Sequence, residues 1–444
     1  MKTFFIETWG CQMNQHDSEL IEGQLRQHGM SPVDTAEAAD LVVLNTCSVR
    51  EKPVHKIISR IGFLAKHRPE AIIGVCGCVA EQEAGSLLDR SKTVGFVLGP
   101  GQTARIGEAV RAVEQGERPV LTGFDAEAEY NFQTIFRKST TRGMVTVIEG
   151  CNEFCTFCIV PYTRGREVSR PLDAIVDEVR SIADDGIKEV ELLGQTINAY
   201  RCPETGVGLA DLLEAVAAVD GLLRVRFITS HPRHFGQDLI DVLAANRNVF
   251  RYLHLPIQSG SDEILKKMHR KYTCDEYLSL VERIRTAAPE INLSTDVIVG
   301  FPGEGEDDFD DTMKVLSQVR FGQVYAFGYS PRPKTPAAQY KPEISDEIKS
   351  ARLQRLFKVS SQISLELNEE LVGSVAQVLI DGESRLNPDH WQGRGEDNRV
   401  VNFPKCGRED VGDVVEVKIH RAGPHSLKGE IVGGAVRLPL VSAG

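Results

Sequence analysis

Six apolar runs of strand length alternate with helix-length runs between residues 144 and 330, and this alternation limits the possible folds more than any other feature. The strand candidates are MVTVIEG, EVELLG, RVRFITS, YLHLPIQ, INLSTDVIVG and GQVYAFGYS, and amphipathic stretches such as DAIVDEVRSIADDG and CDEYLSLVERIRTAA separate them. Consecutive strand–helix units form parallel sheets, because each helix returns the chain to the same edge. The sequence therefore predicts a partial (β/α)6 barrel.

Several of these strand candidates carry polar side chains at alternate positions. Glu189 and Glu191 share one face of one strand, and Ser294 and Asp296 share one face of another. Parallel strands that are covered on both sides are usually apolar throughout. We therefore expect a wide or split barrel with a polar lumen that a ligand fills. The alternative is that some of these faces, Arg224 among them, meet solvent at an open edge.

The first 120 residues show the same alternation on a smaller scale. FFIETW, DLVVLNT, AIIGV and VGFVL are typical of strands, and SELIEGQLRQHG, VHKIISRIGFLAKH and EQEAGSLLDR are typical of helices. We predict a small parallel α/β domain over residues 1–120. Residues 120–140 are polar and aperiodic, which indicates a linker to a second domain at 137–370.

The C-terminal part of the sequence has a different pattern. After the proline-rich stretch PRPKTPAAQYKP we expect a long amphipathic helix with Ile348, Leu356 and Ile363 near one face. Short β-rich runs follow, SVAQVLID, NRVVNF, VVEVKIH and LKGEIV. They predict a small five-stranded all-β barrel over residues 371–437. The fold class is thus α/β with a C-terminal all-β module.

Three cysteines, Cys151, Cys155 and Cys158, lie within eight residues in the loop after the first strand of the central domain. A structural zinc site needs four protein ligands, and neither a His nor a further Cys occurs between Cys158 and Cys202. A four-iron cluster held by three thiolates keeps one iron open for a small molecule. The spacing therefore favours an iron–sulfur cluster over a zinc knuckle or buried thiols.

Three further cysteines, Cys11, Cys47 and Cys78, each follow a different strand of the N-terminal domain. The carboxyl ends of parallel strands meet at one edge of a sheet, where ligand sites gather. A second three-thiolate cluster is the favoured interpretation, and three core cysteines are the alternative. Cys76 belongs to the apolar strand itself, where a small thiol packs well, so we take Cys78 as the ligand.

Charge and cysteine usage narrow the functional classes. A formal net charge of -12 argues against a protein that coats nucleic acid indiscriminately, although it leaves a local RNA-binding surface open. The first residues, MKTFFIETWGCQMN, reach polar side chains too soon for the apolar region expected of a secretory signal, and no run approaches the roughly 18 apolar residues of a membrane span. We expect a cytoplasmic protein with no membrane contact, whose ten cysteines serve metal binding or catalysis rather than disulfides.

The ordered motifs resemble the radical S-adenosylmethionine (SAM) methylthiotransferases. TWGCQMN, NTCSVRE, GCVA and the triple-cysteine loop with IVPYTRGRE occur in the order of that family, and the β-rich tail resembles a TRAM domain. LPIQSGSDEILKKMHRKYT, SPRPKTPAA and GRGEDNRVVNF are similar to the tRNA-modifying members of the family. The resemblance spans nearly the whole chain.

This resemblance implies two [4Fe-4S] clusters and SAM as cofactors. The cluster that cleaves SAM would be held by Cys151, Cys155 and Cys158. An auxiliary cluster, at which a methylthio group is assembled, would be held by Cys11, Cys47 and Cys78. The SAM contacts that the resemblance implies are Phe157, Gln195 and the turn with Gly300, Pro302 and Gly303. The alternatives are that Phe157 packs against the cluster and that the turn is an ordinary barrel loop.

By the same resemblance the substrate is isopentenyladenosine next to the anticodon of tRNA, which becomes the 2-methylthio derivative at C2 of the adenine. A reducing electron-transfer protein such as flavodoxin or ferredoxin, and a monomeric state, are further expectations. The side chains that could contact RNA are Arg394, Arg399, Lys405, Lys428 and Trp391. The alternatives are a methylthiotransferase for a ribosomal-protein aspartate or for threonylcarbamoyladenosine, and a non-catalytic iron–sulfur protein that binds RNA.

Overall fold

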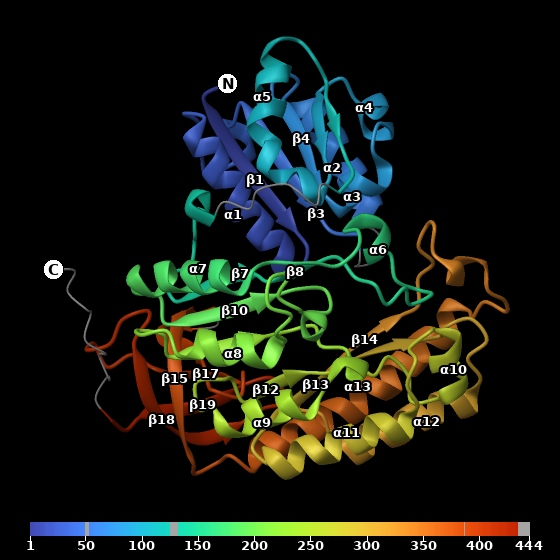
Figure 1. Ribbon diagram of the computed structural model, residues 1–444, viewed down its shortest axis with the longest axis vertical. Coiled ribbons are helices and arrows are strands. Elements are labelled where there is room, and N and C mark those ends of the chain that lie inside the picture. Colours follow the sequence, from blue (N-terminus) through green and yellow to red (C-terminus); the bar gives the residue numbers. More distant parts are fainter. Residues whose placement is uncertain (49–52, 125–131, 386, 434–444) are drawn as a thin grey trace.

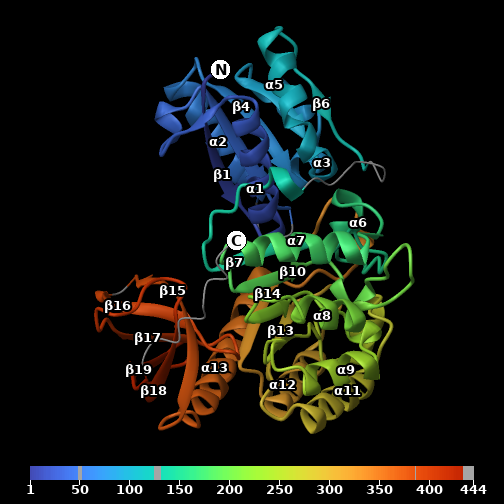
Figure 2. The same ribbon diagram turned by 60° about the vertical axis from the view of Figure 1, so that its left-hand side comes forward.

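The computed structural model describes residues 1–48, 53–124, 132–385 and 387–433. An N-terminal α/β unit lies above a central α/β unit, and a β-rich unit lies beside the lower part of the central one (Figures 1 and 2). In the part of the chain that the structure describes, no helix is both long and apolar enough to span a bilayer.

The N-terminal unit is built on a six-stranded parallel sheet with the order β2-β1-β3-β4-β5-β6. Its strands are β1 (Thr3–Trp9), β2 (Ser31–Pro32), β3 (Leu41–Thr46), β4 (Ile72–Gly77), β5 (Val94–Leu98) and β6 (Val120–Leu121). Its helices are α1 (Gln12–Gln27), α2 (Pro53–His67), α3 (Cys78–Glu83), α4 (Ser86–Arg90) and α5 (Ile106–Glu114).

The apolar strand β3 explains why this unit has two cores. Val42 and Leu44 belong to one core, whereas Leu41 and Val43 belong to the core on the other face of the sheet. Successive side chains of a strand point to opposite faces, so a strand that is covered on both sides must be apolar throughout.

The four strands that the sequence predicts in this unit are confirmed. The expected single helix over EQEAGSLLDR is wrong, because Ala84 adopts a left-handed conformation with a φ of 44° and separates α3 from α4. Helix α5 and the short edge strands β2 and β6 were not predicted. In the expected linker, residues 125–131 lie outside the described residues.

The central unit contains all six predicted parallel strands. They form two three-stranded sheets, β11-β10-β7 and β12-β13-β14, which a parallel bridge between Val225 and Val249 connects. The partial barrel is thus confirmed. Its strands are β7 (Arg142–Thr146), β10 (Glu189–Leu193), β11 (Arg224–Phe227), β12 (Tyr252–His254), β13 (Asn292–Val299) and β14 (Gln323–Gly328).

Helices cover the outer face of this barrel, and the largest apolar core lies between them and the strands. The covering helices are α7 (Leu172–Asp184), α8 (Leu209–Ala217), α9 (Gln237–Ala245), α11 (Cys274–Ala287) and α12 (Glu306–Val319). The short helix α10 (Asp262–Lys267) instead contributes Ile264 to a separate small apolar cluster. Three short elements, β8 (Ile148–Glu149), α6 (Val160–Thr163) and β9 (Val168–Ser169), surround the triple-cysteine loop.

The polar strand faces point into the barrel, where Glu189 and Glu191 are buried and pair with arginines. Arg226 Nη1 lies 3.3 Å from Glu189 Oε1, and Arg142 Nη1 lies 3.3 Å from Glu191 Oε2. The solvent-facing alternative for Arg224 is wrong, because this side chain is buried against the C-terminal unit. The polar residues of these strands therefore show that charged side chains occupy part of the barrel interior.

Helix α13 (Asp346–Glu369) leads into the C-terminal barrel. Leu356 and Ile363 are buried as expected, but Ile348 is 46% exposed, so the apolar face is shorter than predicted. The strands β15 (Val375–Ser384), β16 (Asn387–Arg394), β17 (Val400–Pro404), β18 (Val414–Ala422) and β19 (Leu427–Ile431) close in the order β15-β16-β17-β19-β18. Of the predicted span, residue 386 and residues 434–437 lie outside the described residues.

Candidate iron–sulfur and SAM site

The three N-terminal cysteines converge at the carboxyl edge of the sheet. Cys11 is the N-cap of α1, Cys47 directly follows β3, and Cys78 is the first residue of α3 after β4. Strands β1, β3 and β4 are neighbours in the sheet, which places these three positions side by side. A hydrogen bond with Cys47 lowers the pKa of Cys11 to about 6, against the opposing effect of burial.

A buried amide network holds this cysteine edge together, and sequence reasoning did not identify it. Asn45 Nδ2 donates to the backbone oxygen of Asn14 at 2.8 Å and to Ser18 Oγ at 2.9 Å. Gly77 has a φ of 89°, and a Cβ there would lie 2.6 Å from Asn45 Oδ1. The glycine before Cys78 is therefore needed both for its conformation and for space.

Cys76 lies apart from this edge. It packs in the apolar core that contains Phe96 and Ile106, and burial raises its pKa. Cys78, by contrast, lies just beyond the end of β4, at the edge of the sheet where it interacts electrostatically with Cys11. The geometry supports the choice of Cys78.

The triple-cysteine loop crosses the carboxyl end of the barrel. Gly150 has a φ of 78°, and a Cβ there would lie 2.1 Å from the backbone oxygen of Arg166. Cys151 Sγ lies 3.1 Å from Thr196 Oγ1. Burial, and next the neighbouring Cys155, raise the pKa of Cys158 to about 12. The three thiols therefore lie close enough to interact electrostatically.

Residues 267–271, which comprise the last residue of α10 and the segment after it, bind the cysteine loop along its length. This contact could not be predicted from the sequence, because the segment is irregular and its His269 and Lys271 have positive φ values. The contacts are Thr156 N to Met268 O at 3.0 Å, Thr156 Oγ1 to Lys267 O at 2.8 Å, His269 Nδ1 to Phe154 O at 3.3 Å, Arg270 Nη1 to Cys155 Sγ at 3.6 Å and Lys271 Nζ to Glu153 Oε2 at 3.3 Å.

Glu153, inside the cysteine loop, is surrounded by basic groups. Its carboxylate lies 2.6 Å from His234 Nε2, 3.3 Å from Lys271 Nζ and 3.6 Å from Arg233 Nη1. The His234 hydrogen bond holds the pKa of Glu153 well below its usual range, although burial opposes this. Glu153 thus fixes the loop to the segments that follow β11 and α10.

Gln195 contacts the cysteine loop from the barrel side. Its Oε1 accepts a 2.5 Å hydrogen bond from the backbone N–H of Gly150. Its Nε2 is buried, and no described residue accepts a hydrogen bond from it. A buried donor without a partner is costly, so it fits a ligand that offers an acceptor, such as the carboxylate of SAM.

The glycine-rich turn after β13 lies close to Phe157. Gly300 and Gly303 have φ values of 73° and 79°, and Gly300 N–H donates to Glu304 Oε2 at 2.6 Å. Phe301 belongs to a small buried apolar cluster, and Phe157 packs against the same cluster. The structure thus brings together two of the expected SAM contacts, and it gives Phe157 a packing role. Pro302 of the same turn is buried.

The donor sets at both sites suit thiolate-bound iron. All ten cysteines lie among the described residues and are free thiols. Each site has one buried guanidinium: Arg270 contacts Cys155, and Arg164 interacts electrostatically with Cys78 and Cys11. A buried cation beside several thiolates compensates their charge. These residues therefore fit two iron–sulfur clusters.

Most of the expected RNA-contacting side chains already have partners. Trp391 Nε1 donates to Glu409 Oε1 at 3.0 Å, and Lys405 Nζ lies 4.6 Å from the centroid of the Trp391 ring. Arg394 pairs with Asp381 at 3.5 Å, and Arg399 Nε donates to Asn368 Oδ1 at 2.7 Å. Lys428 is exposed on β19. Phe403 is fully buried and belongs to the barrel core.

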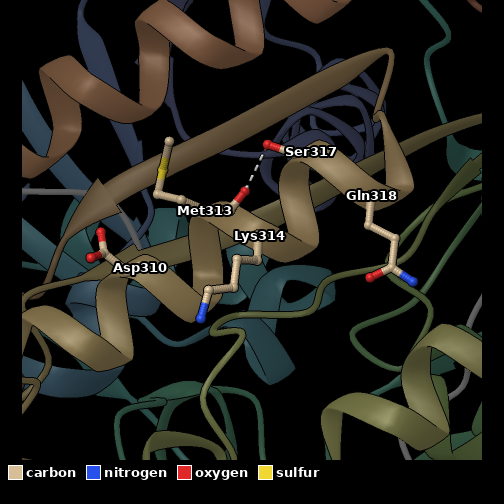
Figure 3. A pocket seen from close by; sticks show the side chains of 5 residues that line it. All are labelled: Asp310, Met313, Lys314, Ser317 and Gln318. Atoms are coloured by element: carbon tan, nitrogen blue, oxygen red, sulfur yellow. Dashed lines mark hydrogen bonds between the residues drawn. The ribbon is translucent and has the colours of Figure 1, made fainter.

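Hollows on the outer surface do not coincide with the cysteine sites. One lies along α12 and is lined by Asp310, Met313, Lys314, Ser317 and Gln318 (Figure 3). A second lies between α11 and α12. Their lining residues include none of the cysteines, glycines or basic side chains described above, so we place the site at the cysteines.

Solved structures share the fold of most of this chain. The radical SAM methyltransferase TsrM from Kitasatospora setae, with cobalamin and a [4Fe-4S] cluster bound, superposes with a TM-score of 0.56 at 15% identity, over 85% of this chain and 77% of that one. The cobalamin-dependent SAM radical enzyme OxsB superposes with a TM-score of 0.53 at 12% identity, over 82% of this chain and 58% of that one. At these identities the likeness concerns the fold alone.

Family models match three parts of the sequence. Residues 3–99 match the uncharacterized protein family UPF0004, residues 145–316 match the radical SAM superfamily, and residues 369–432 match the TRAM domain. The partial barrel with its triple-cysteine loop thus defines a radical SAM protein.

Curated relatives match nearly the full chain. The tRNA-2-methylthio-N(6)-dimethylallyladenosine synthase of Alkalilimnicola ehrlichii is 43% identical over 436 residues, which cover 97% of each chain. That of Yersinia enterocolitica is 44% identical over 436 residues, or 96% of this chain and 92% of the relative. This protein belongs to the family of tRNA-2-methylthio-N(6)-dimethylallyladenosine synthases.

Proposed function

We propose that this protein converts N6-(dimethylallyl)adenosine next to the anticodon of tRNA into its 2-methylthio derivative, by radical SAM chemistry. The observation that carries the proposal is the presence of two separate three-cysteine sites in one chain whose full length resembles the synthases named above. A protein that only transferred electrons would need neither the glycine-rich turn nor the unpartnered donor of Gln195.

The six cysteines divide into two ligand sets. The cluster that binds and cleaves SAM is assigned to Cys151, Cys155 and Cys158, and the auxiliary cluster to Cys11, Cys47 and Cys78. SAM contacts are assigned to Phe157, Gln195, Gly300, Pro302 and Gly303. When bound, the clusters and SAM supply the electron, the radical and the methylthio group. A radical is needed because the aromatic C–H of adenine has no proton that an ordinary base can remove.

The chain itself positions the two sites and shields them. Arg164, just after α6, pairs with Asp17 of α1 at 2.5 Å and with Glu149 at 3.3 Å, and its side chain is 3% exposed. This buried contact fixes the N-terminal unit to the cysteine loop of the barrel. Fixed, water-excluding geometry favours reactions between bound groups, because it removes the cost of bringing them together.

The functional units follow from this assignment. We assign the auxiliary cluster to residues 1–120, SAM cleavage to residues 137–370 and RNA binding to residues 371–437. The substrate places the reaction in the cytoplasm, where tRNA is found, and a reductant such as flavodoxin or ferredoxin supplies electrons to a monomeric enzyme. Exposed Lys428 on β19 is the first candidate for a phosphate contact.

An anaerobic assay tests the substrate assignment. The full chain, reconstituted with iron and sulfide, is mixed with SAM, a reductant and isopentenylated tRNA, and the digested nucleosides are analysed by mass spectrometry. The 2-methylthio nucleoside is expected, and tRNA without the isopentenyl group serves as the control. SAM cleavage without this product, but with modification of threonylcarbamoyladenosine tRNA or of a ribosomal protein, would contradict the proposed substrate.

A further inference from the structure

Arg270 is buried directly beside the cysteine loop. Its side chain makes three hydrogen bonds: Nη1 to Cys155 Sγ at 3.6 Å, Nη2 to the backbone oxygen of Pro256 at 3.0 Å and Nε to Tyr272 Oη at 3.0 Å. The residue as a whole is only 5% exposed. The guanidinium is thus held rigidly, with one N–H directed at a cysteine sulfur.

The charge of Arg270 has no carboxylate partner. Among the described residues, no Asp or Glu oxygen lies within 4.0 Å of its nitrogens, and its two oxygen partners are a backbone carbonyl and a phenol. Arg164 at the other cysteine site differs, because Asp17 and Glu149 both pair with it. A buried cation is costly unless an anion lies nearby. At Arg270, the thiolates of the cysteine loop are the groups that can supply that negative charge.

Other charged groups at the loop largely balance one another. Glu153 is the acidic group inside the loop, and Lys271, Arg233 and His234 surround it within 4 Å. Glu167, a second acidic group beside the loop, accepts hydrogen bonds from Asn152 at 2.9 and 3.1 Å. The basic partners of Glu153 sit partly in solvent, with side chains 30–46% exposed, so water screens them. Arg270 is therefore the buried, uncompensated positive charge closest to the cysteine sulfurs in this part of the structure.

We propose that Arg270 sets the reduction potential of the SAM-cleaving cluster through its N–H···S hydrogen bond to Cys155 and its buried charge. This inference rests on the proposed function, because it requires a cluster at Cys151, Cys155 and Cys158. A reduced cluster carries one more negative charge than an oxidised cluster, so a fixed cation beside it stabilises the reduced form. Hydrogen bonds to the sulfurs act in the same direction. Arg270 is thus a positioning residue that makes the cluster easier to reduce.

The test uses the full chain with Cys11, Cys47 and Cys78 changed to Ala, so that a single cluster remains. Iron and sulfide are counted after reconstitution, and the reduced cluster is followed by electron paramagnetic resonance during a reductive titration. In this background Arg270→Gln should shift the midpoint potential to more negative values. Arg180→Gln is the matched control, because Arg180 is 63% exposed on α7, and it should leave the potential unchanged.

Arg270→Lys keeps the inference testable if Arg270→Gln fails to assemble a cluster. A lysine retains the charge but cannot make the three hydrogen bonds of the guanidinium fork, so its potential should lie below that of the parent and above that of Arg270→Gln. The inference would be overturned if Arg270→Lys, and any Arg270→Gln that assembles a cluster, bound a full complement of iron and had the same midpoint potential as the parent. That result would leave the proposed function intact. A parent that binds no iron would overturn both.

Discussion

At the scale of single residues, Glu409 shows how a carboxylate can fix a side chain that the sequence assigns to RNA. It accepts hydrogen bonds from Trp391 Nε1 at 3.0 Å and from the backbone N–H groups of Cys406 and Arg408 at 2.5 and 3.0 Å. These donors outweigh the effect of burial and lower the pKa of Glu409. Trp391 is therefore a structural side chain of the C-terminal barrel.

Glu409→Gln should destabilise the C-terminal barrel in a pH-dependent way. Because the pKa is lowered in the folded state, the stabilisation is present above the ordinary value near 4.5 and is lost as the pH falls through the folded value. Thermal unfolding followed by Trp fluorescence should show a lower midpoint for the variant at pH 7 and a smaller difference below about pH 4.5. Glu416→Gln on β18, where the side chain is exposed, is the control. An equal difference at both pH values would contradict this account.

Arg164 gives a second prediction at this scale. Arg164→Met leaves Asp17 buried without its partner at the contact between the first two units. Removing one member of a buried pair is strongly destabilising, so the first thermal transition should fall by about 5–10 °C. Arg180→Met removes an exposed pair with Asp177 and should change it by less than about 2 °C. Equal shifts in calorimetry would show that the buried pair has no special role.

At the scale of elements, the strands that have a clear hydrophobic pattern could be predicted from the sequence. The six barrel strands and the four main N-terminal strands are continuous apolar or alternating runs, and each was predicted. Strand β16 was missed because its sequence, NPDHWQGR, is polar and contains a proline. Its pairing with β15 and β17 depends on the closed barrel, which no local pattern reveals.

The candidate site likewise contains residues that the sequence pattern could predict and residues that it could not. Local spacing predicted the three cysteines of the loop, and strand order predicted Cys11, Cys47 and Cys78, because each of these follows the end of a strand. Residues 267–271 and the Asn14–Asn45 network could not be predicted, since they act across more than 30 residues of sequence and have no periodicity. Buried pairs such as Arg164 with Asp17, 147 residues apart, also require the folded chain.

The turn after β13 yields a prediction for SAM binding. Gly300→Ala places a Cβ 2.4 Å from Lys349 Cγ and keeps a φ of 73°, which costs a residue with a side chain about 1–2 kcal/mol. Equilibrium dialysis of the iron-loaded protein should show SAM binding weakened by about fivefold or more. Gly62→Ala on α2 is the control, because no atom lies within 4 Å of its added Cβ. Unchanged affinity in Gly300→Ala would remove the turn from the SAM site.

At the scale of the whole molecule, the C-terminal barrel is docked on the central one by buried polar contacts. Arg224 donates to the backbone oxygens of Arg394 at 3.0 Å and Gln377 at 2.9 Å, and Asn292 Nδ2 donates to Asp397 O at 2.9 Å. Together with the Arg164 contact, this docking makes the three units one framework for a large substrate (Figure 2).

Arg224→Met should loosen this docking. Small-angle scattering should show a larger radius of gyration, and tRNA binding should weaken by about tenfold, since two buried hydrogen bonds of about 1 kcal/mol each are lost. SAM cleavage without tRNA should be unchanged, because the cysteine loop lies at the other end of the barrel strands. Loss of SAM cleavage together with tRNA binding would point instead to misfolding of the barrel.

The central claim, two cysteine sites with different tasks in one chain, is tested most directly by one comparison. Cys11→Ala and Cys151→Ala are each reconstituted, and SAM cleavage and the 2-methylthio nucleoside are measured in the same reactions. Cys11→Ala should still cleave SAM but form no methylthio product, whereas Cys151→Ala should lose both activities. Methylthiolated tRNA from Cys11→Ala, or SAM cleavage by Cys151→Ala, would contradict the division between the two sites.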